Sequence, residues 1–119
     1  MKNFLAVYIG TASAREASEW ERMDAEKRKS REAAGVKAWG DWMVAHQAAI
    51  VFQGGPLGKT KRAASAGISD IKNSMTGFVI VQAESHAAAA KMFENHPHFA
   101  IFPGESVEIM ECLPIPGQS

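Results

Sequence analysis

Histidine is the residue type in this chain best suited to acid–base chemistry near neutral pH. The 119-residue sequence contains four histidines: His46, His86, His96 and His98. A carboxylate hydrogen-bonded to a histidine fixes its tautomer, and Asp70 and His98 both fall at ends of predicted elements, where loops carry function. We therefore predict Asp70 and His98 as a catalytic base and acid. In the alternative interpretation, Asp70 stabilises a turn and His98 caps the segment after Pro97.

The histidines do not predict a metal centre. His96 and His98 flank Pro97, but zinc needs three or four ligands, and no HxxxH or CxxC motif accompanies this pair. His86 falls in the first turn of a predicted helix, where the helix dipole disfavours a cation, so we expect a solvated surface residue. The sequence also lacks a P-loop, a nucleophile elbow and a dinucleotide fingerprint. We therefore expect no metal and no cofactor.

Two tryptophans and a glycine-rich segment are the candidate ligand contacts. Trp39 and Trp42 are three residues apart, so they share one face of a predicted helix, with His46 one turn further along. Aromatic residues at this spacing form either a core or dimer interface or a surface that stacks on a planar ligand. Segment 53–58 reads QGGPLG, whose glycines let the backbone approach a ligand closely. The predicted ligand-binding residues are Trp42, His46, Gly54 and Gly55.

Four apolar runs of strand length must position these residues. The predicted strands cover 4–9, 49–52, 77–84 and 106–113. In the first strand, Leu5, Val7 and Ile9 are predicted to lie under helices, and Phe4, Ala6 and Tyr8 face the other way. The tyrosine either faces a pocket or lies in the core with its hydroxyl hydrogen-bonded. The polar segment 65–75 is predicted to be a mobile loop or irregular hairpin.

Two helical regions separate these strands. Ser13-Ala-Arg-Glu16 has the spacing of a capping box and predicts a helix start, followed by a solvated face in which acidic and basic residues alternate as far as Glu32. Ala34-Gly35 is a predicted break, after which the helix buries its large side chains. A second helix is predicted over 86–95 and stopped by Pro97, because the residue before a proline avoids the α region.

The order β, α, β, loop, β, α, β predicts one α+β domain over residues 1–119, with a ferredoxin-like split βαβ sheet and helices on one face. The opposite face is expected to expose apolar side chains in a monomer: Phe4, Phe78, Ile80 and Met110. Stacking two sheets face to face buries this surface, and a two-fold interface is the commonest way to do so. We therefore predict a homodimer.

Charge and composition exclude several classes of partner. Thirteen basic and thirteen acidic residues cancel, so we expect neither nucleic acid nor an anionic membrane as a partner. No apolar run approaches the ~20 residues that a membrane helix needs. A single cysteine, Cys112, cannot close an internal disulfide, which agrees with a reducing compartment. These observations predict a cytoplasmic protein.

Several short motifs, taken in order, resemble those of the YCII-related (DGPF) family. They are Trp39-x-x-Trp42, Gln53-Gly-Gly-Pro-Leu57, Gly67-Ile-Ser-Asp70, the run from Gly77 to Ser85, Pro97-His98 and Gly104-Glu-Ser-Val-Glu108. The resemblance covers about the last eighty residues and, more loosely, the first strand. It implies a dimeric α+β barrel with a ligand cleft between the sheet and the loops on the helix side. A few relatives are dehydrochlorinase-like enzymes that act on chlorinated hydroxyquinols, and others occur beside or fused to sigma factors.

The resemblance also bears on the catalytic residues. One branch of the family looks as though it uses a His-Asp pair, with the histidine early in the helix before the glycine-rich turn, which here falls near Ala38 or Trp39. No histidine stands there, and His46 lies about two turns later. Asp70 and His98 match patterns of the Trp-x-x-Trp branch.

Two functional hypotheses follow. The first is a cofactor-independent lyase or isomerase that moves a proton on a small aromatic or enol-like molecule, with Asp70 and His98 as base and acid. The second is a non-catalytic ligand-binding or regulatory interaction module, in which the same pocket binds without turnover. A pocket that contains titratable groups with shifted pKa values favours the first hypothesis.

Overall fold

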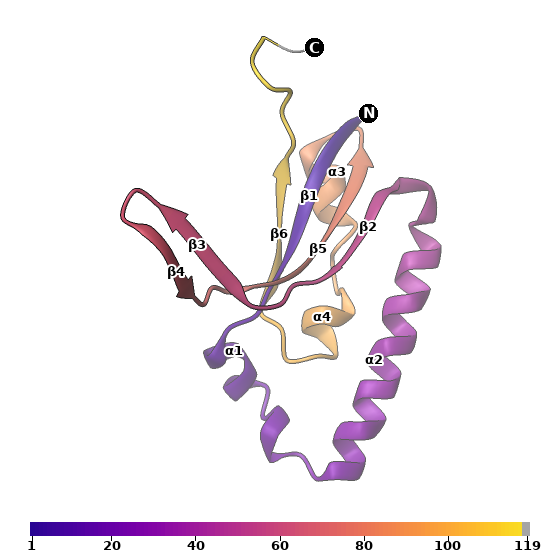
Figure 1. Cartoon of the computed structure of the whole chain (residues 1–119). Helices are drawn as coiled ribbons and strands as arrows, with labels where there is room; N and C mark the ends of the chain where they lie inside the picture. Colours follow the sequence, from indigo (N-terminus) through magenta and orange to yellow (C-terminus); the bar gives the residue numbers. More distant parts are fainter. Residues whose placement is uncertain (118–119) are drawn as a thin grey trace.

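The apolar runs predicted as strands form one antiparallel sheet in the computed structural model, which describes residues 1–117. Its strands are β1 (Lys2–Ile9), β2 (Ile50–Pro56), β5 (Met75–Ala83) and β6 (Ser106–Glu111), and their order across the sheet is β2-β5-β1-β6. This is the ferredoxin-like order, in which the first and third strands of the motif are central (Figure 1). The predicted α+β fold class is confirmed.

The helices lie between and beside these strands. They are α1 (Ala12–Ala17), α2 (Ala25–Ala45), α3 (His86–Lys91) and α4 (Pro97–Ala100), with short 3₁₀ turns η1 (Trp20–Arg22) and η2 (Gln47–Ala49). Pro97, predicted to end a helix, occupies the first turn of α4. Proline is well suited there, because the backbone N–H groups in the first turn of a helix have no partner within the helix. The N–H that proline lacks therefore costs no hydrogen bond.

The predicted capping box at Ser13 and Glu16 is wrong. Thr11 is the N-cap of α1: its backbone is extended after β1, and its hydroxyl accepts a hydrogen bond from the backbone N–H of Ala14 at 3.1 Å. The long helix α2 begins separately at Asp24, whose carboxylate accepts a hydrogen bond from the N–H of Lys27 at 2.8 Å. Two local caps therefore divide a region that the charge pattern had suggested was one helix.

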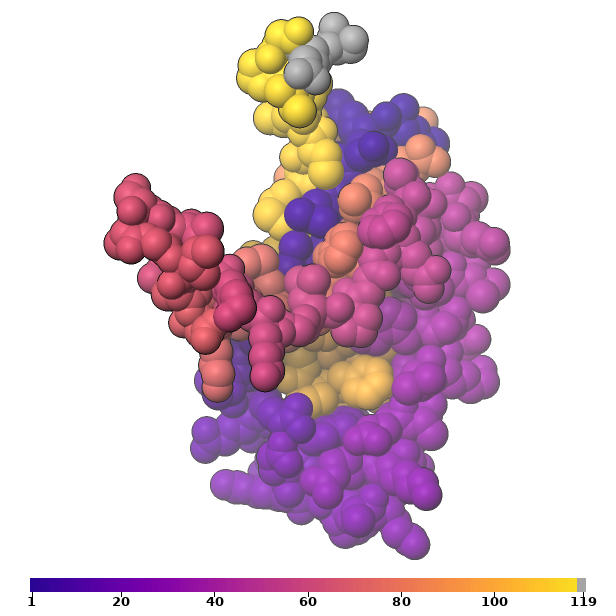
Figure 2. Space-filling view, in the orientation of Figure 1, coloured from indigo at the N-terminus to yellow at the C-terminus, as the bar shows by residue number. Residues whose placement is uncertain are grey.

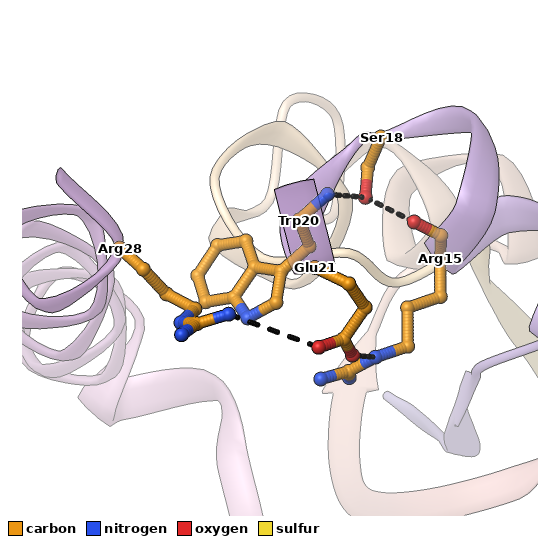
Figure 3. Close-up of polar contacts among 5 residues, drawn as sticks. All are labelled: Arg15, Ser18, Trp20, Glu21 and Arg28. Atoms are coloured by element: carbon orange, nitrogen blue, oxygen red, sulfur yellow. Dashed lines mark hydrogen bonds and ion pairs between the residues drawn. The ribbon is translucent and has the colours of Figure 1, made fainter. Parts of the chain in front are cut away.

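Polar contacts hold the connection between α1 and α2 in place (Figure 3). Glu21 pairs with Arg15 of α1 on one side and with Arg28 of α2 on the other, the second pair at 3.8 Å. The hydroxyl of Ser18 donates to the carbonyl of Arg15 and accepts from the backbone N–H of Trp20. These contacts tie both helices to Trp20, which is only 4% exposed.

The break predicted at Ala34-Gly35 is also wrong, because α2 runs through it without interruption. Gly35 is buried, and a Cβ atom there would lie 2.5 Å from the ring of Phe102. The glycine lowers helix propensity, but its missing side chain lets the phenyl ring pack directly on the helix backbone. Trp20 covers Phe102 from another side, with 6.0 Å between ring centroids.

The two faces of β1 are the reverse of those predicted. Phe4, Ala6 and Tyr8 point to the helix-covered side, and Leu5 and Val7 lie on the open face, opposite Ile80 and Phe78 of β5. Phe4 has no exposed surface, so it does not belong to the uncovered patch. The two sets of alternating side chains were predicted correctly. An apolar run with no polar residues, however, does not indicate which of the two faces the helices cover.

The helix-covered side of the sheet holds the hydrophobic core. The residues of this core come from the sheet, α2 and the α3 region: Phe4, Ala6, Tyr8, Trp42, Val79, Val81, Ala83, Ala89 and Phe93. In Figure 1, α3 and α4 lie behind the sheet, and in the space-filling view of Figure 2 no helix covers the near face of the sheet, beside which α2 is visible.

The segment predicted as a loop or irregular hairpin forms a second, separate sheet. Its strands are β3 (Thr60–Ala64) and β4 (Gly67–Ile71). The hairpin projects from the body of the molecule (Figures 1 and 2), and every residue between its two end positions is exposed.

Candidate functional site

A cavity of ≈ 530 Å³ lies between α2 and the end of the sheet where β2 and β5 pair. Its walls are mostly apolar and aromatic, with backbone from several glycines. The lining residues are Tyr8, Val36, Trp39, Gly40, Met43, Gln53, Gly54, Gly55, Pro56, Thr76, Gly77, Phe78, His98 and Phe102. Its volume and composition are typical of small-molecule sites.

His98 is the titratable base of this cavity. It lies on α4, is 8% exposed, and its Nε2 donates a hydrogen bond to the carbonyl of Ile9 at 2.7 Å. This bond places the proton on Nε2 and leaves Nδ1 as an acceptor. No residue of the described chain is hydrogen-bonded to Nδ1, and this atom is not sealed in the interior.

The environment of His98 favours a neutral imidazole. Burial lowers its pKa, and the hydrogen bond to the Ile9 carbonyl acts in the opposite direction. Gly104 makes room for the ring, because a Cβ atom at that position would lie 2.4 Å from His98 Nε2. A buried neutral histidine with one free nitrogen is suited to accept a proton from a bound molecule.

Tyr8 supplies a second titratable group on the same wall. Its ring lies 5.3 Å from that of His98, and the residue is 5% exposed. Within residues 1–117 its hydroxyl has no hydrogen-bond partner, and the hydroxyl oxygen is not completely buried. Burial raises the pKa of Tyr8, so the phenol stays protonated and can donate.

The two tryptophans of α2 have different surroundings. Trp39 lines the cavity and packs 4.8 Å from Tyr8. Trp42, predicted to contact a ligand, does not line it: its Nε1 donates to the carbonyl of Met92 at 2.9 Å, inside the core. His46 stacks on Trp42 at 4.4 Å and bonds through Nδ1 to the Trp42 carbonyl. The three-residue step between the two tryptophans leaves them about 60° apart around the helix, and this rotation separates wall from core.

The glycine-rich segment, predicted to be a turn after a strand that ends at Phe52, instead forms the end of β2 (Ile50–Pro56). Gly54 and Gly55 both line the cavity, at the end of β2, where the pairing with β5 is interrupted by register shifts. Gly54 has φ = 64°, and a Cβ atom there would lie 2.0 Å from the carbonyl oxygen of Phe78. Only glycine fits this bulge, which turns the edge strand toward the cavity.

The structure does not bring Asp70 and His98 together. Asp70 lies on β4 of the projecting hairpin, where its carboxylate pairs with Lys61 at 2.7 Å and its side chain is 81% exposed. It borders a different surface hollow, at the base of the hairpin. No carboxylate lines the cavity that contains His98. Within one protomer, the predicted pair is replaced by His98 and Tyr8.

Tyr8 and Trp39 line the cavity but were not among the predicted site residues. Tyr8 was considered as a pocket residue, and its position at the end of β1, just before Gly10, was the signal that could have favoured this alternative. Trp39 shares the Trp-x-x-Trp motif with Trp42, and only the rotation of the helix distinguishes them. His86, predicted to be a solvated surface residue, is exposed, and its Nε2 is hydrogen-bonded to the carbonyl of Ile109 at 2.7 Å.

Two further observations concern metals and membranes. Among residues 1–117, no three His, Cys, Asp or Glu side chains gather closely enough to hold a metal ion. In the same part of the chain, no helix has the length and apolar character needed to cross a membrane.

Comparison with known proteins supports the fold. The sequence matches no family model and no curated protein sequence. Among solved structures, the chain is similar to 5-chloro-2-hydroxyhydroquinone dehydrochlorinase from Burkholderia phenoliruptrix AC1100, in complex with 2,5-dihydroxybenzoquinone. The TM-score is 0.51 at 19% identity, over 98% of this chain and 99% of that chain. The chain therefore has the YCII-like α+β fold of this dehydrochlorinase over the matched 98% of its length.

Proposed function

We propose that this protein is a cofactor-independent enzyme that transfers a proton on a small, planar, oxygen-bearing aromatic or enol-like molecule. One observation carries the proposal: a single apolar cavity contains a buried neutral histidine and a buried phenol, neither of which uses all its hydrogen-bonding capacity within the protein. Titratable groups with shifted pKa values, gathered in a cavity, are typical of catalytic sites.

His98 acts as the general base in this proposal. Its Nδ1 accepts a proton from a hydroxyl group or an acidic carbon of the ligand, and the imidazole becomes a cation. The Nε2–H bond to the carbonyl of Ile9 stabilises this cation and holds the ring in place during the transfer. General-base catalysis of this kind contributes about 10²- to 10⁴-fold to the rate.

Tyr8 acts as the hydrogen-bond donor. Its hydroxyl meets the oxygen of the ligand on which negative charge develops as the base removes the proton. The side chains of Trp39 and Phe102 border the same space and suit a flat ligand. The proton then either returns to another ligand atom, which is an isomerisation, or stays on the base while a leaving group departs with its bonding electrons, which is a lyase reaction.

The structural neighbour supports this class of reaction. Its name describes a dehydrochlorinase of a chlorinated hydroxyhydroquinone, and its bound molecule is a dihydroxybenzoquinone. Both are small, planar and oxygen-rich, which agrees with the size and aromatic walls of the cavity here.

The second part of the proposal is a homodimer that covers the open face of the sheet. This face carries Leu5, Phe78 and Ile80, and at its edges Phe52 and Met110 are 56% and 43% exposed. Each such side chain contributes roughly 1.5–3 kcal/mol when it becomes fully buried. Light scattering at micromolar concentration should give twice the mass of the chain, and Met110→Glu should shift the protein toward monomer. A wild-type protein that is monomeric and well folded would contradict this part.

The activity is tested with the two compounds named for the structural neighbour, the chlorinated hydroxyhydroquinone and the dihydroxybenzoquinone. Purified protein is incubated in D₂O with 5-chloro-2-hydroxyhydroquinone, and chloride release and deuterium incorporation are measured. Binding of 2,5-dihydroxybenzoquinone is measured in parallel by calorimetry. Tyr8→Phe, which keeps the ring and removes only the hydroxyl, should reduce turnover on the order of 10-fold or more.

The alternative is a ligand-binding module without turnover. The absence of a carboxylate from the cavity lining favours this alternative, because many catalytic histidines are oriented by one. The protein would be a binding module and not an enzyme if it binds the quinone but releases no chloride and incorporates no deuterium. In that case the affinity for the quinone should be the same in Tyr8→Phe.

A further inference from the structure

His96 is the most completely buried polar residue of the described chain and contacts no part of the cavity lumen. It is 1% exposed and forms the N-cap of α4. Its Nδ1 accepts a hydrogen bond from the backbone N–H of His98 at 3.0 Å. Because Nδ1 accepts, the proton of the neutral ring is on Nε2, and this atom is buried without a hydrogen-bond partner.

The ring of His96 lies directly behind the wall that carries the proposed acid and base. Its centroid is 5.2 Å from that of Tyr8 and 4.6 Å from that of Trp39. On its far side it packs against Trp42 at 4.8 Å. One side chain therefore touches the ring of Tyr8, a wall of the cavity, and the backbone that bears His98.

Helix capping alone does not explain a histidine at this position. Asparagine, aspartate or serine caps a helix with a smaller side chain and leaves no buried N–H unsatisfied. A buried group without a partner has an energetic cost that calls for an explanation. The flat ring fills the space between Tyr8, Trp39 and Trp42, which a shorter cap would leave open.

We propose that His96 is a positioning residue, which sets the spacing of Tyr8 and His98 by packing against the first and hydrogen-bonding the backbone of the second. The inference rests on the proposed acid–base function and names the residue on which its geometry depends. The ring must stay neutral for this role, since a protonated Nδ1 no longer accepts from His98. The titratable groups that face it are Tyr8, His98 and His46, and none of them is a carboxylate that would favour a cation.

Two substitutions separate the parts of this role. The side-chain oxygen in His96→Asn replaces Nδ1, so the cap of α4 is kept while the ring is lost. His96→Gln places an amide near the position of Nε2 and loses the cap. His86→Asn is the matched control, because His86 is exposed and is not part of the cavity lining.

The main readout does not need turnover. The imidazole nitrogens of His98 are followed by NMR across pH in the wild type and in each variant, and circular dichroism monitors folding. In His96→Asn we expect a folded protein in which the pKa of His98 rises toward its ordinary value, because water enters where the ring was. In assays with the quinone compounds, kcat should fall on the order of 10- to 100-fold, with KM changed by less than about threefold.

Two outcomes would decide against the proposal. An unchanged His98 titration in His96→Asn would show that His96 only caps α4. Unfolding of both His96 variants, with His86→Asn folded, would assign His96 to stability alone. If the wild type shows no turnover at all, the proposed function fails, but the His98 titration still determines whether His96 positions the pair.

Discussion

The cavity wall around His98 and the β3–β4 hairpin each contain one of the two residues predicted to be catalytic, and they differ in every physical respect. His98 is 8% exposed, surrounded by aromatic rings and bonded to a backbone carbonyl. Asp70 lies on a hairpin exposed on both sides, paired with a lysine that is itself 74% exposed.

This difference shows why burial, rather than residue type, makes a titratable group useful. In the wall, desolvation lowers the pKa of His98 and raises that of Tyr8, so each is held in the form that the proposed reaction needs. In the hairpin, water and salt screen the charges, so an exposed ion pair contributes little to the free energy of unfolding. The predictions below are ordered from the largest expected effect to the smallest.

The most direct test of the comparison exchanges one residue in each region. His98→Gln keeps a side-chain N–H that can donate to the Ile9 carbonyl but removes the base, so turnover should fall about 100-fold or more. Asp70→Asn should change turnover by less than about twofold. Chloride release from the chlorinated hydroquinone measures both. Equal losses would show that the hairpin reaches a cavity in the assembled protein and would restore the originally predicted pair.

A second test concerns the backbone of the cavity. Gly54→Ala should destabilise the protein by at least about 2 kcal/mol, because the left-handed conformation is strained for alanine and its Cβ meets the Phe78 carbonyl. Gly55→Ala is the control, since nothing lies within 4 Å of a Cβ atom there. Urea denaturation measures both free energies of unfolding. Similar values for the two variants would contradict the packed bulge.

The third prediction concerns acid stability. Burial first, and then the proximity of His98 and His46, lowers the pKa of His96 to about 4, below its ordinary value. The unfolded chain therefore binds a proton more readily than the folded chain. The contribution of His96 is complete above about pH 6.5 and is lost as the pH falls toward 4, by roughly 3 kcal/mol in all.

Urea denaturation at several pH values between 7 and 4 measures this dependence. His96→Asn should flatten the curve in this range, because asparagine does not titrate. A wild-type curve that is level down to pH 4 would show that the ring accepts a proton without cost.

The smallest effect is expected in the hairpin. Lys61→Ala removes the partner of Asp70, but both side chains are largely exposed, so the free energy of unfolding should change by less than about 1 kcal/mol. Thermal denaturation at low and high salt measures it. A large, salt-dependent loss would show that the hairpin packs against another surface in solution.

The order of the main strands, the fold class and the start of α3 at His86 could be predicted from the sequence. Strand-length apolar runs and local caps such as Ser85 are properties of neighbouring residues, so they are visible in the chain itself. Gly54 was predicted from its residue type to lie close to a ligand, and it lines the cavity, but from a bulge of β2 and not from a turn.

Only the tertiary structure decided which side of each element is buried. Phe4 and Leu5 are equally apolar, and the helices behind the sheet determine which of them is covered. Trp39 and Trp42 share one motif, but the direction in which α2 packs places only Trp39 in the cavity wall.

The same reason explains why Asp70 and His98 lie apart in the folded protein. Asp70 and His98 are 28 residues apart in the sequence, and nothing local fixes the distance between a hairpin and a helix cap. The hairpin forms its own two-stranded sheet and does not join the core, so Asp70 stays in solvent. Tyr8 meets His98 because β1 ends beside α4, where the carbonyl of Ile9 accepts the imidazole N–H. Contacts between segments distant in the chain determine this site, and they arise only when the chain is folded.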